Sequence, residues 1–136
     1  IQASKLGLRD KAYEMYLRTA RLDLDDYNND TEDGCHITSM AGTWLAVVKG
    51  FGGLRIEKGK ENSSQLVLNP YCPTHWQALA FKIRFQGALL QITTTQLDVV
   101  IENFSSHPVT LLLFGQSVTV NATSQEQVSI SPAATV

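Results

Sequence analysis

The sequence predicts an α+β fold, with helices in its first part and a small antiparallel two-layer β-sandwich in its second. Up to about Gly53 the apolar residues recur every three or four positions, which is the period of a helix. From about Gln65 onward they form short alternating runs separated by turn residues, which is typical of strands in a sandwich. The stretch between these two parts is rich in glycine, serine and charged residues. We therefore expect two units, residues 1–54 and residues 65–131.

The helical part is expected to open with the end of one helix and a complete second helix. Residues 1–7 have the composition of a helix that closes at Gly7, because glycine accepts the left-handed conformation found at many helix ends. Over residues 8–26, Leu8, Ala12 and Tyr16 share one stripe, which predicts a helix of about four turns. Since the first helix has no visible beginning, we interpret the sequence as a fragment of a larger protein.

A third helix is expected to begin near Asp33 or Gly34, with Thr31 or Asp33 as N-cap, and to end at Lys49 before "GFGG". Its apolar residues point in almost every direction: Ile37, Met40, Ala41, Trp44, Leu45, Ala46, Val47 and Val48. A helix of this kind is one surrounded by protein. Because the sequence offers only one complete partner helix and the β part, we expect further structure to cover it.

Seven short strands are predicted in the second part. Their expected ranges are 65–69, 78–85, 88–94, 97–103, 109–114, 117–122 and 126–130. Alternation is clearest before Phe85, and the tight spacing "FQGA" predicts a hairpin at Gln86 and Gly87. Short strands at close intervals with no helices between them favour a sandwich.

Composition excludes several classes of function. The net charge of -2, the pI near 5.9 and the absence of a Lys/Arg cluster argue against a nucleic-acid or anionic membrane partner. No stretch is long and apolar enough for a membrane span, and no signal peptide is visible. Cys35 and Cys72 lack metal-ligand spacing, so we expect two buried thiols in a reducing, cytoplasmic setting, with no cofactor and no metal.

The acidic run before the third helix has part of a calcium-loop pattern. Asp26, Asn28 and Asp30 stand at its first, third and fifth positions. The pattern then fails, since Thr31 replaces the glycine of the sixth position and Ile37 replaces the glutamate of the twelfth. A loop built on its own hydrogen bonds is the favoured interpretation.

A polar stripe follows at the start of the third helix. His36 falls in the expected first turn, and Ser39 and Thr43 lie three and seven residues further on the same face. Imidazole, hydroxyl and free amide donors at the positive end of a helix could hold a phosphate or sugar hydroxyls. Alternatively, His36 and Ser39 cap the helix and bind the acidic loop, and from the spacing alone this second interpretation is favoured.

No other catalytic pattern stands out in the sequence. It contains no glycine-rich phosphate loop, no nucleophile elbow and no zinc-protease motif. His75, His107 and Glu102 are isolated from other reactive residues in the sequence, and we expect each to be structural.

Three segments carry a resemblance to a known family. They are "KAYEMYLRTARLDLDDYNND", "DGCHITSMAGTWLAVVKGFGGLR" and "LNPYCPTHWQALAFKIRFQGALLQI". These resemble the C-terminal end of the glycoside hydrolase family 65 phosphorylases, the maltose, trehalose and kojibiose phosphorylase group, over residues 1–92. The resemblance implies that residues 1–54 are the last helices of an (α/α)6 catalytic barrel and that a C-terminal β-sandwich with a structural role follows.

The resemblance also implies an activity for the whole protein. Enzymes of this group cleave an α-glucosidic bond of a disaccharide with inorganic phosphate, invert the anomeric centre and release β-glucose 1-phosphate. Phosphate is a co-substrate, the rest of the barrel is the partner of this fragment, and the whole protein could form a homodimer. The general-acid glutamate of the family lies upstream, so we expect no catalytic residue in this sequence and no activity from it alone.

The family's phosphate pocket uses a G-x-H-x-x-S motif, which corresponds to Gly34, His36 and Ser39. The resemblance therefore favours phosphate binding by His36 and Ser39, with Thr38 as a weaker candidate. Two alternatives stay open. The whole protein could be a related α-glucoside hydrolase, or the β part could be a carbohydrate-binding or interaction module.

Overall fold

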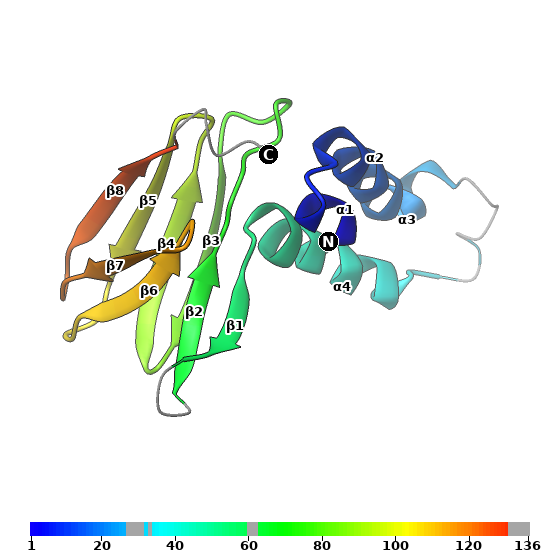
Figure 1. Cartoon of the computed structure of the whole chain (residues 1–136). Coiled ribbons are helices and arrows are strands. Elements are labelled where there is room, and N and C mark those ends of the chain that lie inside the picture. Colours follow the sequence, from blue (N-terminus) through cyan, green and yellow to red (C-terminus); the bar gives the residue numbers. More distant parts are fainter. Residues whose placement is uncertain (27–31, 33, 60–62, 131–136) are drawn as a thin grey trace.

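The computed structural model describes residues 1–26, 32, 34–59 and 63–130, and it places a helical part beside a β-sandwich (Figure 1). The helices are α1 (Gln2–Lys5), α2 (Arg9–Ala20), α3 (Leu22–Asp25), α4 (Ile37–Leu45) and the π-helix η2 (Ala46–Phe51). The strands are β1 (Arg55–Lys58), β2 (Ser64–Leu68), β3 (Leu79–Phe85), β4 (Ala88–Thr94), β5 (Asp98–Asn103), β6 (Val109–Leu113), β7 (Gln116–Val120) and β8 (Gln125–Ser129). The predicted α+β class is confirmed.

Helix α1 ends as the sequence predicts. Gly7 has φ +74°, and its N–H donates to the carbonyl of Ser4 at 3.1 Å while that of Leu8 donates to the carbonyl of Ala3 at 2.9 Å. These two bonds form the Schellman motif, in which glycine closes a helix without steric strain. The turn redirects the chain into α2.

The second helix, predicted as about four turns within residues 8–26, corresponds to α2, and the rest of that stretch forms the separate short helix α3. The break lies at Arg21, whose φ of -103° departs from helical values. The Arg21 guanidinium then holds Asp25 through two hydrogen bonds, of 2.6 and 2.7 Å, which stabilise the short α3. Asp26, with φ +48°, ends it.

The third helix begins later and ends later than predicted. Its N-cap is His36, so a start near Asp33 or Gly34 is wrong; the predicted N-caps Thr31 and Asp33 lie outside the described residues. Beyond Leu45 the chain continues as η2 to Phe51, with the N–H of Gly52 bonded to the carbonyl of Val47 at 2.7 Å. That spacing of five residues is the π-helical one.

The end of η2 lies against the sandwich, and this contact explains the glycines that follow it. A Cβ on Gly52 would stand 2.6 Å from the Phe81 ring, and one on Gly53, which has φ +58°, would stand 2.3 Å from the carbonyl oxygen of Asn69. Only glycine permits so close an approach of backbone to neighbouring atoms. The C-terminal end of η2 therefore packs directly against the sandwich.

The sandwich consists of two four-stranded sheets, in the orders β1-β2-β6-β7 and β3-β4-β5-β8. All seven predicted strands are confirmed, and β1 adds one that we predicted as connector. The expectation of a purely antiparallel sandwich is wrong, because β2 and β6 pair in parallel. Between them the chain passes through three strands of the other sheet, so no hairpin forces these neighbours to run in opposite directions.

The predicted β3–β4 hairpin is confirmed. Gln86 and Gly87 have φ of 49° and 83°, which are the left-handed values of a type I′ turn. The register pairs Phe85 with Ala88, so the side chains of both strands alternate between core and solvent in phase.

Two clusters of buried side chains hold the molecule together. The first fills the space between the sheets, and its members are Leu66, Leu68, Phe85, Ala88, Leu90, Ile92, Val99, Ile101, Val109, Leu111, Leu113 and Val120. The second joins the helices to the sandwich through Ala12, Phe51, Tyr71 and Leu79, with Trp76 packed against it. The Trp76 ring stands edge-on to Phe51 at a centroid distance of 5.3 Å, a favourable aromatic geometry.

Candidate anion site at the start of α4

The predicted polar stripe lies at the end of the helical part that is farthest from the sandwich (Figure 1). His36 occupies the N-cap position of α4 instead of its first turn, and its carbonyl accepts hydrogen bonds from the N–H groups of Ser39 and Met40. The N–H groups of Ile37 and Thr38 come before the first helical acceptors and therefore have no partner within the helix. The positive end of the α4 dipole thus carries unpaired donors.

Asp23, from α3, holds His36 in place with both carboxylate oxygens. Oδ1 lies 2.5 Å from Nδ1 of the imidazole, and Oδ2 accepts from the backbone N–H of His36 at 2.9 Å. The hydrogen bond from the His36 side chain lowers the pKa of the Asp23 carboxyl, so Asp23 is ionised at neutral pH. A carboxylate at Nδ1 sets the orientation of the imidazole ring.

The sequence-based capping interpretation is therefore correct for one of its two parts. His36 does bind the acidic segment, as that interpretation expected, but α4 has no side-chain cap hydrogen bond. The side-chain contact to Asp23 is made by Nδ1 of the ring. We missed the role of Asp23, because thirteen residues separate it from His36 and no local spacing relates them.

The other predicted residues take different positions around the start of α4. Ser39 is half-buried in the first turn, whereas Thr38 and Gly34 are exposed. The hydroxyl of Thr43 donates to the carbonyl of Ser39 at 2.8 Å, so it is turned onto its own helix. Gly34 has φ +99°, and a Cβ there would meet no atom within 4 Å. The requirement for glycine at this position is therefore conformational and not steric.

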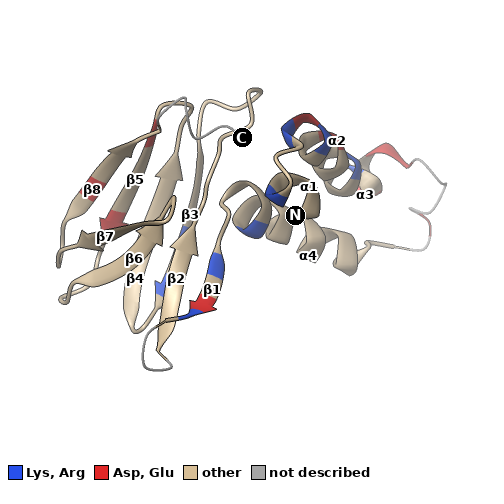
Figure 2. Cartoon of the chain, viewed as in Figure 1, with Lys and Arg blue, Asp and Glu red and all other residues tan. Residues whose placement is uncertain are grey.

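Charge near the site is largely paired. Figure 2 shows acidic residues of α3 at the same end of the helical part as the start of α4. Asp25 is bound by Arg21 and Asp23 by His36, which limits their repulsion of an anion. Asn28 and Asp30 of the rejected calcium pattern lie outside the described residues. Within the described ranges, no group of three or more His, Cys, Asp or Glu side chains could hold a metal ion.

The helix that carries the site presents large apolar side chains to solvent. Ile37 is 77% exposed and Trp44 is 59% exposed, while Val48, further along the same run, is buried. The sequence predicted a helix surrounded by protein, but in the structure the apolar side chains Ile37, Met40 and Trp44 of α4 are more than half exposed. The apolar surface at the N-terminal half is therefore left uncovered within the described part of the chain.

The two cysteines differ from each other. Cys72 is buried as predicted, and burial raises the pKa of its thiol. Cys35 is exposed, so the expectation of two buried thiols is wrong for this one. It precedes the N-cap in a non-helical segment that the helix does not cover. Both are free thiols.

The three residues that we expected to be structural each contact a neighbouring group. The His75 ring stacks on Tyr13 with centroids 4.2 Å apart, and the carbonyl of His107 accepts a hydrogen bond from Asn103. Glu102 accepts a hydrogen bond from Gln91 on the neighbouring strand at 2.7 Å. Across residues 1–26, 32, 34–59 and 63–130, no helix combines the length and the apolar character needed to cross a bilayer.

Comparison with known proteins matches both parts of the chain to one family. The family profile described as "Glycosyl hydrolase family 65 central catalytic domain" covers residues 1–45, and "Glycosyl hydrolase family 65, C-terminal domain" covers residues 60–120. The chain belongs to glycosyl hydrolase family 65. The resemblance seen in the sequence is thereby confirmed, and the helices and the sandwich correspond to different domains of the family.

Relatives within glycosyl hydrolase family 65 are similar over most of the chain. The maltose phosphorylase of Bacillus subtilis is 41% identical over 118 residues, and the α,α-trehalose phosphorylase of Thermoanaerobacter brockii is 39% identical over 118 residues. Each match covers 87% of this chain and 15% of the relative, so the chain spans a small part of the length of these proteins. A solved structure described as a candidate kojibiose phosphorylase from the human microbiome superposes with a TM-score of 0.83 at 32% identity, over 95% of this chain and 18% of that one.

Proposed function

We propose that the chain is the C-terminal part of an inverting disaccharide phosphorylase and that it supplies part of the phosphate site. In this proposal residues 1–54 are the last helices of an (α/α)6 catalytic barrel, and residues 65–131 form the C-terminal β-sandwich. Support comes from the relatives, which carry the names maltose and trehalose phosphorylase, and from the matches to two domains of one family. The exposed apolar side chains of α4 are then covered by the remaining barrel helices.

The observation that carries the proposal is the arrangement of donors at the start of α4. Asp23 binds Nδ1 of His36 and orients its ring, and the amides of Ile37 and Thr38 lie at the positive end of the helix. Ser39 adds a hydroxyl in the same turn. An imidazole oriented by Asp23, a hydroxyl and free amides are donors suited to a phosphate dianion.

The phosphate held there is the nucleophile of the proposed reaction. One of its oxygens attacks the anomeric carbon of the glucosyl unit from the face opposite the glycosidic bond, and a new C–O bond forms as the old one breaks. A carboxylic acid from another part of the protein gives its proton to the leaving oxygen, so the second sugar departs as a neutral alcohol. Attack from the opposite face gives β-glucose 1-phosphate from an α-glucoside.

The role of this chain in that reaction is positioning. The His36 ring and the Ser39 hydroxyl hold phosphate in place of the water that an inverting hydrolase activates. The proposed general acid, a glutamate of the barrel, lies outside residues 1–136, so the chain alone is expected to be inactive. The sandwich acts as a structural support, since the aromatic cluster around Phe51 and Trp76 fastens the last helix to it. Cytoplasmic location and a homodimer of the whole protein are further parts of the proposal.

The test is made in the whole protein that contains this chain. His36→Ala and Ser39→Ala should each raise KM for phosphate at least tenfold, because each removes one charge-assisted or hydroxyl contact to the anion, while the affinity for the disaccharide changes little. Initial rates of β-glucose 1-phosphate release are measured with phosphate and disaccharide varied separately. His107→Ala and Ser117→Ala are matched controls on exposed residues of the sandwich.

The same measurements distinguish the competing hydrolase. A hydrolase releases free glucose whether or not phosphate is present, and the two substitutions would then affect the use of disaccharide and phosphate equally. Equal losses would therefore contradict the phosphate role of His36 and Ser39. Unchanged kinetics would contradict it as well.

A further inference from the structure

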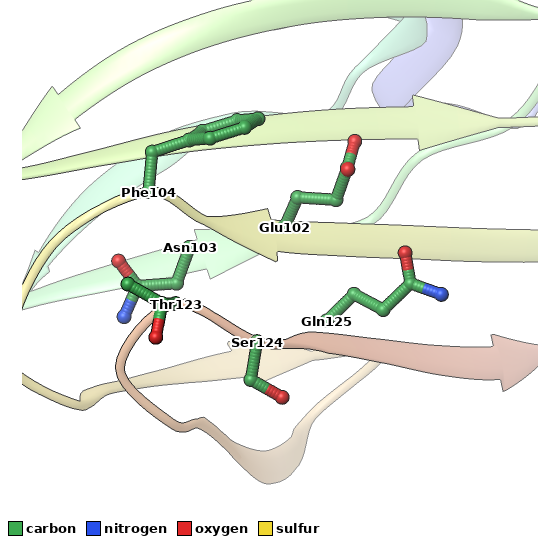
Figure 3. Close-up of a pocket in the computed structure, with 6 residues that line it drawn as sticks. All are labelled: Glu102, Asn103, Phe104, Thr123, Ser124 and Gln125. Atoms are coloured by element: carbon green, nitrogen blue, oxygen red, sulfur yellow. The ribbon is translucent and has the colours of Figure 1, made fainter.

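The outer face of the sheet β3-β4-β5-β8 carries an open pocket at the ends of β5 and β8. Its lining residues are Glu102, Asn103, Phe104, Thr123, Ser124 and Gln125 (Figure 3). Phe104, Glu102 and Gln125 extend to the same side of the two strands in this view. In Figure 1, β8 lies at the edge of the sandwich farthest from the helices, so this pocket and the candidate anion site are at opposite ends of the molecule.

A row of polar side chains crosses the sheet beside the pocket. The register places Lys82, Gln91, Glu102 and Gln125 opposite one another on four successive strands. Gln91 donates to Oε2 of Glu102 at 2.7 Å, which orients the carboxylate. Oε1 of Glu102 and the amide of Gln125 have no hydrogen-bond partner among the residues that the structure describes. One strong acceptor and one group that both donates and accepts are thus free at the pocket.

An aromatic ring stands next to these polar groups. Phe104 is 50% exposed, whereas the other aromatic side chains that could have bound a ligand, Tyr71, Trp76, Phe81 and Phe85, are buried or half-buried in the two core clusters. The ammonium of Lys82 lies 5.0 Å from the centre of the Phe104 ring, a cation–π contact that holds the ring over the sheet. An exposed apolar ring beside oriented polar groups in a pocket offers a ligand both an apolar surface and hydrogen bonds.

The backbone under the ring is held firmly. The Asn103 amide donates to the carbonyls of His107, Val120 and Asn121, and its oxygen accepts from the N–H of Ser105. The two loops are also bonded to each other, from the N–H of Asn103 to the carbonyl of Ser124 and from that of Thr123 to the carbonyl of Ser105. These bonds fix the position of Phe104 before any ligand arrives, which lowers the entropic cost of binding.

We propose that this pocket binds a neutral oligosaccharide, with Phe104 stacking on the apolar face of a pyranose ring and Glu102 and Gln125 bonding its hydroxyls. The electron-rich face of an aromatic ring attracts the polarised C–H groups of a sugar. Sugar hydroxyls donate and accept, and they therefore match a carboxylate beside an amide. The pocket offers no cluster of positive charge, so an anionic ligand such as phosphate or nucleic acid is not favoured. The proposal does not depend on the phosphate role of His36.

The test measures the binding of two uncharged probes, maltoheptaose and cellohexaose, to the whole protein by isothermal titration. The structure predicts saturable binding of at least one probe, and Phe104→Ala should weaken it about tenfold or more because the stacking surface is lost. Phe104→Trp should retain or strengthen binding. Glu102→Ala should also weaken binding of the probe. Melting temperatures of all variants establish that each one is folded.

Matched controls separate this pocket from the rest of the protein. Leu97→Ala removes another exposed apolar side chain, 72% exposed, from the opposite end of β5, and it should leave probe binding unchanged. His36→Ala should also leave it unchanged, so failure of the phosphate proposal would not affect this result. Absence of saturable binding by both probes, or equal binding by wild type and Phe104→Ala, would overturn the proposal.

Discussion

The helical part and the sandwich differ in how completely they cover their own apolar side chains. In the sandwich, twelve apolar side chains form one buried cluster between the sheets. In the helical part, Ala12, Val48 and Phe51 are buried, while many large side chains are exposed: Leu6, Leu8, Met15, Leu17, Leu24, Ile37, Met40 and Trp44. Two sheets packed face to face bury each other's apolar side chains, whereas a few helices in one layer leave one side of each helix uncovered.

This difference indicates that the helical part is the one expected to depend on structure outside the chain. Exposed apolar surface of this extent on the described helices is what remains when a neighbouring layer is removed from a domain. The sandwich needs no such layer. We therefore expect mutations in the two parts to respond differently when the chain is studied alone and when it is studied within the whole protein.

The largest effect is expected in the sandwich core. Leu90→Ala should lower the free energy of unfolding of the 136-residue chain by about 2–5 kcal/mol, because Leu90 is fully buried and the substitution leaves a cavity. Met40→Ala on α4 should change it by less than about 0.5 kcal/mol, since that side chain is 52% exposed. Urea unfolding followed by circular dichroism measures both.

Repeating the experiment in the whole protein sharpens the comparison. If barrel helices cover α4 there, Met40→Ala should become clearly destabilising, whereas the exposed sandwich residue Ile56, changed to Ala, should remain near neutral in both settings. A Met40→Ala effect that is equally small in the whole protein would contradict the proposed covering layer.

The next effect concerns the junction between the two parts. Gly53→Ala should destabilise the chain by about 2–4 kcal/mol, since it adds left-handed strain and forces a Cβ against the backbone of Asn69. Gly34 also has a positive φ, of +99°, but open space around it, so Gly34→Ala should cost about 1–2 kcal/mol. Thermal unfolding of the two variants measures the difference. Equal losses would indicate that contact with the sandwich adds nothing at Gly53.

A smaller and pH-dependent effect is expected at Asp23. Because its hydrogen bonds to His36 lower the folded-state pKa of Asp23 below the reference value of 3.8, the stabilisation is present above that value. It is lost as the pH falls through the lowered pKa. The difference in melting temperature between wild type and Asp23→Asn should therefore shrink as the pH falls below about pH 4. A difference that stays the same or grows below about pH 4 would contradict this account.

The smallest effect on stability, and the simplest contrast between the two parts, concerns the cysteines. Iodoacetamide should modify exposed Cys35 in the native chain, whereas Cys72, which is 5% exposed and has a pKa raised by burial, should be protected. Mass spectrometry of peptides after timed labelling gives the two rates. In denaturant both thiols should react alike; similar rates in the native chain would show that Cys72 is not shielded.

Local pattern was sufficient for much of the fold. The alternation before Phe85, the turn at Gln86 and Gly87 and the helix end at Gly7 each depend on a few neighbouring residues, and all three are confirmed. Strand β1 was missed because its four residues are charged or exposed and resemble a connector. The parallel pairing of β2 and β6 joins strands that are distant in the sequence, so no local signal could reveal it.

For the candidate site too, some features follow from the local sequence and others only from the tertiary structure. The sequence by itself determined that His36 and Ser39 stand at the start of an apolar helix, because cap and periodicity are properties of adjacent residues. Only the tertiary structure decided that Asp23 binds Nδ1 of His36 and that Phe104 alone among the candidate aromatics remains exposed. Both facts depend on which segments the folded backbone brings together, and the chain positions of those residues do not contain that information.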